Sequence, residues 1–150
     1  MTNYSGIYVA RMDAVSVTIA KTLVGINAPA GKICEIIRAW VDFSSTTSTV
    51  IDVRLKRHTA AGTSTAFTPL LLHPGDIAAG ATAGINYTAE GTLGDILLRN
   101  TVNYLNGFLY LPVPEERLIV GPSGRFGIEL PTAPGAAVTI TAGIIWGEIG

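Results

Sequence analysis

The feature that most limits what this chain can fold into is the alternation of apolar and polar residues along several short segments. The alternation is clearest over residues 15–19, 51–56, 125–130 and 138–146. A period of two places successive side chains on opposite faces of a β-strand, so each segment predicts a strand with one face on a core. Residues 33–43 alternate more loosely, which predicts a strand with both faces partly covered.

Turn-forming residues separate these segments. Glycine, proline, serine and alanine-rich clusters lie at 28–31, 44–48, 59–64, 122–124 and 131–135, and clusters of this kind predict turns. No window of a dozen residues combines a helical apolar period with helix caps. About eight antiparallel strands without an internal repeat predict an all-β fold, a single-domain β-sandwich over residues 1–150, and within that class a jelly roll.

Two parts of the chain do not fit the alternating pattern. Residues 76–94 are rich in glycine, alanine and threonine, which predicts either a long loop or weak strands. Long loops in compact domains often have a binding role. Residues 1–8 precede the first clear strand, and we interpret them as an N-terminal arm that reaches a neighbouring chain.

The composition favours a protein that is covered by partner chains. Hydrophobic residues make up 48% of the 150 residues and charged residues only 14%, against about 25% charged in typical domains. No run approaches the ~18 apolar residues of a membrane-spanning helix, and the N-terminus lacks a signal-peptide pattern. Because monomers rarely expose large apolar patches, we expect much of this apolar surface to be buried against other subunits.

The charges and the rare residue types exclude several function classes. The net charge of −1 gives no basic surface for nucleic acid or an anionic membrane, so neither partner is expected. Cys34 is the only cysteine and is expected to be a small buried hydrophobe. His58 ends a basic segment and predicts a solvated strand end, while Arg54 and Lys56 predict a solvated face or the side of a sheet that meets an acidic partner.

No group of residues has the spacing of a catalytic, cofactor or metal site. Ser123 lies between a proline and a glycine, which is typical of a turn rather than a nucleophile elbow. Glu115 and Glu116 are adjacent, so in an extended segment they point to opposite sides and share no substrate. Together with Arg117 they predict either a solvated loop or an ion-pairing contact with another subunit. We therefore expect neither an enzyme nor a bound cofactor or metal.

The aromatic residues divide into two groups. Trp40 and Trp146 lie in predicted strands, and we expect both in the core. Tyr104, Phe108 and Tyr110 lie in an apolar, weakly charged stretch that is either core or interface.

Both ends of the chain resemble small virion proteins of tailed bacteriophages. The resemblance rests on the segments 4–11, 15–17 and 26–30 near the N-terminus, and on distal segments that include Leu109-Tyr110-Leu111-Pro112, Pro114-Glu115-Glu116-Arg117, Pro122-Ser123-Gly124-Arg125, Leu130-Pro131-Thr132-Ala133-Pro134 and Trp146-Gly147-Glu148-Ile149-Gly150. These segments cover about half of the chain, and residues 59–100 carry no resemblance.

Within that class, jelly-roll proteins of this size are similar to capsid cement, or decoration, proteins. The resemblance implies a protein on the outer capsid surface of the virion, assembled in the host cytoplasm, with the major capsid protein as its partner. It implies a homo-oligomer, with a trimer favoured and a dimer as the alternative. The candidate subunit or capsid contacts are Tyr4, Ile7, Tyr8, Tyr110, Glu115, Glu116 and Arg117.

Two other functions remain open from the sequence. One is another virion component, such as a tail, head–tail junction or fibre-base protein, which copy number per particle distinguishes from a shell protein. The other is a carbohydrate-binding β-sandwich, because jelly rolls also serve as lectin domains.

Overall fold

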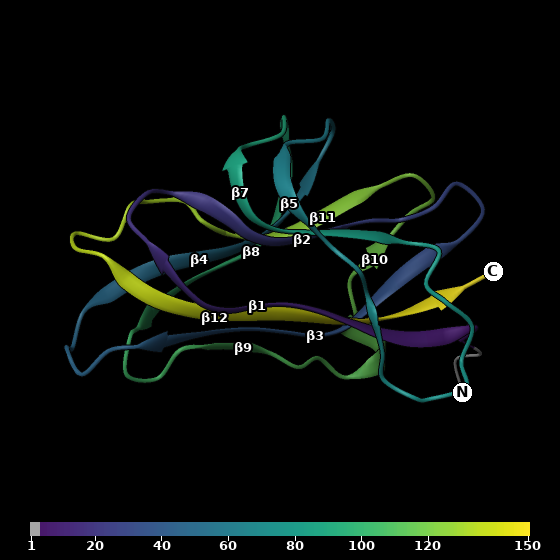
Figure 1. Cartoon of the computed structure of the whole chain (residues 1–150), viewed down its shortest axis with the longest axis horizontal. Helices are drawn as coiled ribbons and strands as arrows, with labels where there is room; N and C mark the ends of the chain where they lie inside the picture. The colour runs from purple at the N-terminus through teal and green to yellow at the C-terminus, as the bar shows by residue number, and fades with distance from the viewer. Residues whose placement is uncertain (1–3) are drawn as a thin grey trace.

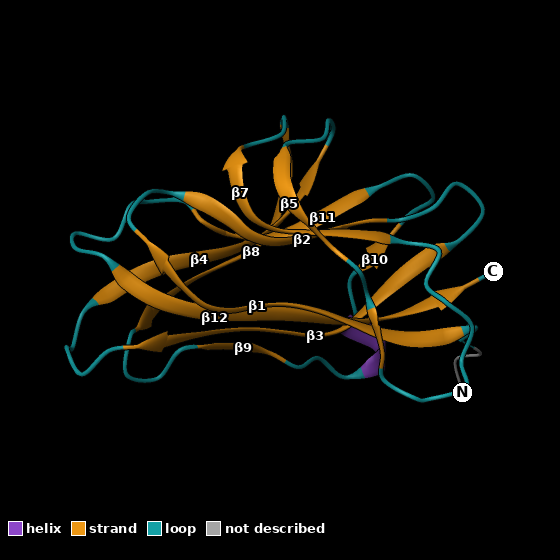
Figure 2. Cartoon of the chain, in the orientation of Figure 1, coloured by secondary structure: helices purple, strands orange, loops and turns teal. Residues whose placement is uncertain are grey.

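The computed structural model describes residues 4–150, and its strands form two facing sheets (Figure 1). Apart from one short 3₁₀ turn, η1 (Pro114–Glu116), the regular structure of these residues is extended (Figure 2). The strands are β1 (Gly6–Val17), β2 (Lys21–Asn27), β3 (Ile33–Ser44), β4 (Val50–His58), β5 (Thr63–Phe67), β6 (Leu70–Leu71), β7 (Thr82–Ala89), β8 (Leu93–Asn103), β9 (Phe108–Tyr110), β10 (Ile119–Val120), β11 (Arg125–Leu130) and β12 (Val138–Ile149). The predicted all-β sandwich is confirmed.

We name the two layers sheet A and sheet B. Sheet A has the order β10-β3-β12-β1-β6, with β9 also paired to β3, and it is the lower layer in Figure 1. Sheet B has the order β5-β7-β2-β11-β4-β8 and is the upper layer. Every pair of neighbouring strands is antiparallel.

Strands from the first part of the chain pair with strands from the last part in a nested order, from the outermost in sequence to the innermost. The first strand pairs with the last (β1 with β12), the second pairs with β11, the third with β9 and β10, and β4 pairs with β8. The chain therefore crosses from one sheet to the other between these strands. The start of β1 and the end of β12 consequently lie at the same end of the sandwich (Figure 1).

The core lies between the two sheets and is supplied by alternate residues of each strand. Trp146, Phe126 and Leu55 are almost fully buried there, and burying a large apolar side chain contributes about 1.5–3 kcal/mol. The prediction of Trp146 as a core residue is confirmed. Cys34 is also buried, as expected, and burial together with the nearby Glu148 carboxylate raises the pKa of its thiol to about 12.

The segment that resisted interpretation from sequence forms part of an added antiparallel strand pair, β5 with β7, whose connection includes β6 of sheet A. Residues 82–89 are strand β7, which pairs with β5 on one side and with β2 on the other. Asn86 has a φ of 49° near the end of β7, a conformation that asparagine tolerates better than most residues. Where β5 begins and β7 ends, this strand pair rises from sheet B (Figure 1). With β5, β6 and β7, residues 4–150 contain twelve strands rather than about eight.

The expected N-terminal arm is wrong for the part that the structure describes. Residues 6–8 already belong to β1 and pair with β12, because the alternation that defines this strand begins earlier than the sequence suggested. Residues 1–3 lie outside the described part of the chain. Within residues 4–150, no helix is long and apolar enough to cross a membrane.

Candidate functional site

The outward surface of sheet A carries a band of apolar and aromatic side chains. Its members in β1, β3, β9 and β12 alternate with buried residues along their strands, and all members are partly or largely exposed. We call this band the outer face of sheet A, and it consists of Tyr4, Ile7, Val9, Trp40, Leu70, Leu109 and Ile145.

The strand register makes this band continuous across the sheet. Val9 is paired with Ile145 on one side and with Leu70 on the other. Trp40 is paired with Leu109 of the edge strand β9. Leu109 is 57% exposed and Leu70 is 44% exposed. Directly opposed residues of an antiparallel pair lie on the same face. Ile145 is opposite Arg38, but the Trp40 ring covers Gly143 in the next row of β12, so the two apolar pairs lie in neighbouring rows of the same face.

Trp40 is the largest side chain on this face. Its indole ring lies over Gly143 of β12, where a Cβ atom would overlap the ring. The Arg38 guanidinium carbon lies 5.1 Å from the Trp40 ring centroid, which is a cation–π arrangement. Trp40 is therefore not a core residue, and that prediction is wrong, because residues 38, 40 and 42 of β3 all point outward.

Tyr4 repeats this arrangement at the other end of β12. Its ring covers Gly147, where a Cβ would again overlap the aromatic atoms. The Arg117 side chain donates a hydrogen bond to the Tyr4 hydroxyl at 2.9 Å and lies 3.4 Å from the Glu35 carboxylate. Two regions that the sequence proposed separately, the N-terminal segment and the proline-flanked loop, are thus brought together here.

The proline-flanked loop is held by Tyr110. The Tyr110 hydroxyl donates to the backbone oxygen of Glu116 at 2.9 Å and accepts from the backbone N–H of Leu118 at 3.1 Å. Glu115 and Glu116 are exposed in η1 and form no ion pair with any described residue. Arg117 points back into the chain, so only the two glutamates offer their charges outward.

Tyr8 is not accessible to a partner. It is fully buried, its ring centroid lies 5.9 Å from that of Trp146, and its hydroxyl donates to the Ile77 carbonyl at 2.8 Å. The prediction of Tyr8 as a contact residue is wrong, because Tyr8 is an inward-facing residue of β1 and not part of an arm. Its neighbour Ile7 points outward and is partly exposed.

The outward surface of sheet B is organised differently. Lys56 on β4 is only 1% exposed and forms an ion pair with Glu129 of β11, which also pairs with Arg54. Glu90, from the connection between β7 and β8, contributes a second carboxylate 3.4 Å from the Lys56 ammonium. The prediction that Arg54 and Lys56 form a solvated face is wrong, because acidic groups of the same chain cover them.

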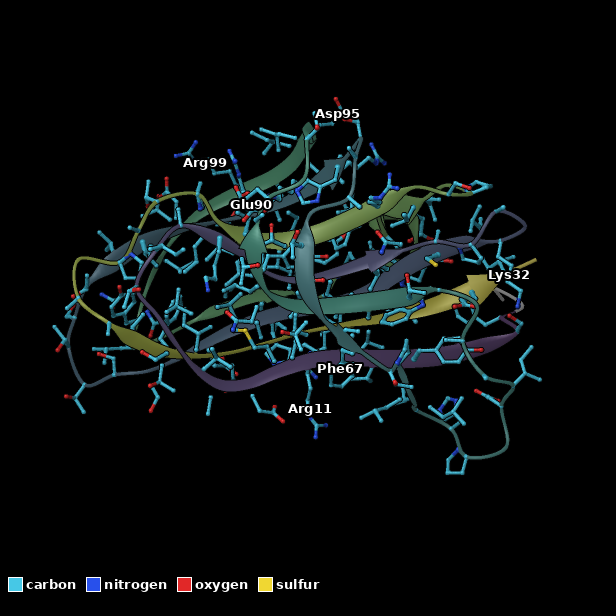
Figure 3. The ribbon with its side chains drawn as sticks, turned by 45° about the horizontal axis from the view of Figure 1, so that its top comes forward. Arg11, Lys32, Phe67, Glu90, Asp95 and Arg99 are labelled. Atoms are coloured by element: carbon cyan, nitrogen blue, oxygen red, sulfur yellow. The ribbon has the colours of Figure 1, made fainter. Side chains whose placement is uncertain are left out.

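Glu90 also connects this cluster to β2. Its carboxylate accepts hydrogen bonds from the backbone N–H and the hydroxyl of Thr22. The register between β2 and β11 shifts beside Thr22, and a shift of this kind leaves a backbone donor without its ladder partner. Glu90 thus satisfies a buried donor and connects the chain that follows β7 to β2 and β4 of sheet B. Figure 3 shows Glu90 on this side of the molecule and Arg11 pointing away from the opposite side.

His58 lies in the same cluster and is buried rather than solvated. Its Nε2 atom has no hydrogen-bond partner and lies 3.9 Å from the Glu90 carboxylate. Burial, followed by the nearby Lys56 charge, lowers the pKa of His58. The prediction of a solvated strand end failed because residues 90–92, distant in sequence, lie beside the end of β4.

Three residues of this cluster are of metal-binding types. The ligand atoms of His58, Glu90 and Glu129 lie within 4.8 Å of one another. The Lys56 ammonium, however, contacts both carboxylates, and together with Arg54 it balances their charge. The residues present therefore form an ion-pair network that is already neutral, which fits an ammonium group better than a divalent cation.

The described residues also line two surface hollows. One, of about 320 Å³, lies between the β3–β4 loop, Tyr104 and the β11–β12 loop. The other, of about 180 Å³, lies near Arg57, Asp95 and Val120. Neither hollow contains any of the residues that the sequence proposed as contacts.

The strongest signal that sequence reasoning missed is the placement of glycine opposite aromatic residues. Gly143 and Gly147 alternate with Ile145 on one face of β12, and they leave room for the rings of Trp40 and Tyr4. We compared the chain with protein-family models, curated proteins and solved structures, and none of the three comparisons gave a match.

Proposed function

We propose that this chain is a structural subunit of a bacteriophage particle, a cement protein that binds the outer surface of the assembled shell and stabilises contacts between capsomers. The observation that carries the proposal is the outer face of sheet A, where Trp40 with Arg38 and Tyr4 with Arg117 lie in an apolar band. Tryptophan, tyrosine and arginine are the residues most enriched among those that dominate protein–protein binding energy.

The physical state of this face supports a role in assembly. The rings of Trp40 and Tyr4 are already fixed over glycines, so binding costs them little rotational freedom. An exposed apolar band of this extent is unfavourable for an isolated chain in water, because apolar area exposed to solvent costs about 25 cal/mol per Å². Covering it with another subunit removes that cost.

The strand connectivity also supports the proposal. Nested pairing of β1 with β12, β2 with β11, β3 with β9 and β10, and β4 with β8 is the pattern that we interpret as a jelly roll. Jelly rolls occur in viral capsid proteins, although they are also found in lectins and other domains. The interpretation agrees with the resemblance of the two chain ends to virion proteins.

A cement protein acts without a reaction. It stabilises the shell because it binds the assembled lattice and not the free subunits, so its contribution follows from mass action. The exposed Glu115 and Glu116 at the end of sheet A are suitable for contact with a basic surface of the major capsid protein.

The experiment is cryo-electron microscopy of particles of the phage that encodes the chain, with copy number measured by quantitative mass spectrometry. We expect density for the sandwich on the outer shell and on the order of hundreds of copies per particle, as lattice symmetry requires. About three to twelve copies located in the tail would favour the alternative virion component, and particles without the chain would contradict both.

A further inference from the structure

We propose that a second copy of this chain covers the outer face of sheet A, related by a two-fold axis that lies in the interface and passes over Trp40. This inference rests on the proposed function, since it names the partner of the same face. Glu115 and Glu116 lie on η1, outside the row through Trp40 over which the axis passes, and they remain the proposed contacts with the shell.

The first argument is the charge pattern around Trp40. Arg38 and Asp42 lie two residues before and two residues after Trp40 on β3, and all three side chains point outward. Both charged residues are exposed, and neither forms an ion pair with another residue of the part described, 4–150. Opposite charges at equal distances on either side of a central tryptophan are what a self-complementary face requires.

A two-fold axis perpendicular to β3 converts this pattern into two ion pairs. The axis stacks β3 antiparallel on the same strand of the second copy, so Arg38 faces Asp42 of the partner subunit. The symmetry repeats the pair on the other side of the axis. The Arg38 guanidinium is already held 5.1 Å from the Trp40 ring centroid, which orients it for the contact before binding.

The rest of the row through Trp40 is compatible with the same axis. Leu109, opposite Trp40 across the β3–β9 pair, meets its own copy in an apolar contact. Arg11 lies in the same row on β1 and would face a like charge, but Asp13 lies 3.0 Å from it and supplies its own counter-charge. The pattern is therefore apolar at Leu109 and Trp40, complementary at Arg38 and Asp42, and internally neutralised at Arg11.

The size of the face is also suitable for a stable dimer. Strands β1, β3 and β12 each contain 12 residues, and three adjacent strands of that length cover roughly 15 Å by 40 Å. Short strands β6 and β9 widen this area at both edges. The result is of the order of the ~800 Å² per partner that a standard interface buries.

Charge reversal tests the pairing and its symmetry together. Arg38→Asp places the introduced carboxylate against Asp42 of the partner subunit, and Asp42→Arg places the introduced guanidinium against Arg38 of the partner subunit. Each variant therefore opposes like charges at both pairs. We expect each single variant to raise the dimer dissociation constant at least about tenfold in sedimentation velocity, because like charges at an interface are strongly unfavourable. An equimolar mixture of the two variants matches opposite charges at both positions and is expected to restore the dimer.

The matched control is Asp95→Arg, an equal charge reversal at a largely exposed side chain on sheet B, which should leave the wild-type dissociation constant unchanged. Circular dichroism and thermal unfolding verify that every variant is folded. The inference would be overturned by a wild-type protein that stays monomeric at about 100 μM, which is roughly 100-fold above a micromolar dissociation constant. A wild-type trimer, or a mixture of the two variants that does not dimerise, would also overturn it. If the chain is found on particles but the equimolar mixture of the two variants does not dimerise, only this pairing is refuted. If the mixture dimerises but the chain is absent from particles, only the proposed function is refuted.

Discussion

The outward faces of the two sheets differ in how their side chains are covered. On sheet A, Trp40 and Leu109 remain partly or largely exposed, and the neighbouring charges are unpaired or lie at the rim. On sheet B, the charged residues of β4 are covered by Glu90 and form a buried network with Glu129. The polar face is thus satisfied within the chain, whereas the apolar face lacks a cover within the described residues.

This difference is the reverse of what polarity alone suggests. A strand with arginine and lysine at every second position is normally solvated, and a strand with tryptophan outward is normally buried. The comparison teaches that the burial of an outward face depends on whether a distant segment of the chain packs over it, and not only on the polarity of its own residues. We therefore expect mutations on the outward face of sheet B to lower the free energy of unfolding, and mutations on the outer face of sheet A to weaken self-association.

Glu129→Ala should have the largest effect on stability. It removes a buried carboxylate that pairs with both Lys56 and Arg54, and it leaves the fully buried Lys56 ammonium with Glu90 alone. Breaking a buried ion pair in this way costs about 3–5 kcal/mol. Urea denaturation should show that loss in the free energy of unfolding.

The control for that variant is Asp13→Ala, which removes an ion pair in which both side chains are exposed. Exposed pairs contribute roughly 0–1 kcal/mol. An equal loss of unfolding free energy in Glu129→Ala and Asp13→Ala would contradict the contrast between a buried network on sheet B and exposed charges on sheet A.

Glu90→Ala should have the next largest effect. It leaves the backbone N–H and hydroxyl of Thr22 without their acceptor, and an unsatisfied buried donor costs about 1–3 kcal/mol. Because Glu90 directly follows β7, which pairs with β5, hydrogen exchange should accelerate in residues 63–67 and 82–89 and not in β12. Glu115→Ala, at an exposed glutamate of η1, is the matched control and should leave exchange unchanged.

A smaller effect is expected from pH. The pKa of His58 is lowered in the folded chain by burial and by the Lys56 charge, against the opposing carboxylates of Glu90 and Glu129. The unfolded chain therefore binds a proton first, and stability should fall as the pH drops below about 6.5 toward the lowered folded value. His58→Gln should reduce the difference in unfolding free energy between about pH 7.5 and about pH 5, and an unchanged difference would contradict the burial of His58.

The smallest effect on stability is expected from Leu109→Ser. Leu109 is 57% exposed on the short edge strand β9, and exposed substitutions usually change stability by less than about 0.5 kcal/mol. Self-association measured by sedimentation should nevertheless weaken. A variant that unfolds readily but associates normally would place Leu109 in the core and not on the interface.

The period-two pattern was sufficient to predict the sandwich, since β4 and β12 largely alternate between buried and less buried residues as the sequence indicated. In β11 the same pattern predicts one outward face, but both faces are buried, because Glu129 lies in the ion-pair network on sheet B. The pattern failed where outward residues are covered by distant segments. Nothing near His58 or Lys56 in sequence indicates Glu90, which approaches only because the chain that follows β7 folds over sheet B. The size of Trp40 favours the core, but its position in the alternation, between Arg38 and Asp42, places it on the outward face.

The candidate contacts show the same limit. The neighbourhood of Tyr4 and Arg117 requires the pairing of β1 with β12 and of β3 with β10, which sequence spacing does not determine. Tyr8 faces the core because β1 begins inside the segment for which the sequence predicts an arm, and its neighbours Ile7 and Val9 face outward. A shift of one residue moves a side chain from one face of a strand to the other.

Hydroxyl-radical footprinting of the two tryptophans tests the central claim, that other chains cover the outer face of sheet A, most directly. Trp146 is fully buried and serves as an internal control that should stay unreactive in every sample. We predict that Trp40 is oxidised in dilute protein and becomes protected as the concentration rises and in assembled particles. Equal oxidation of Trp40 in all of these samples would contradict the claim.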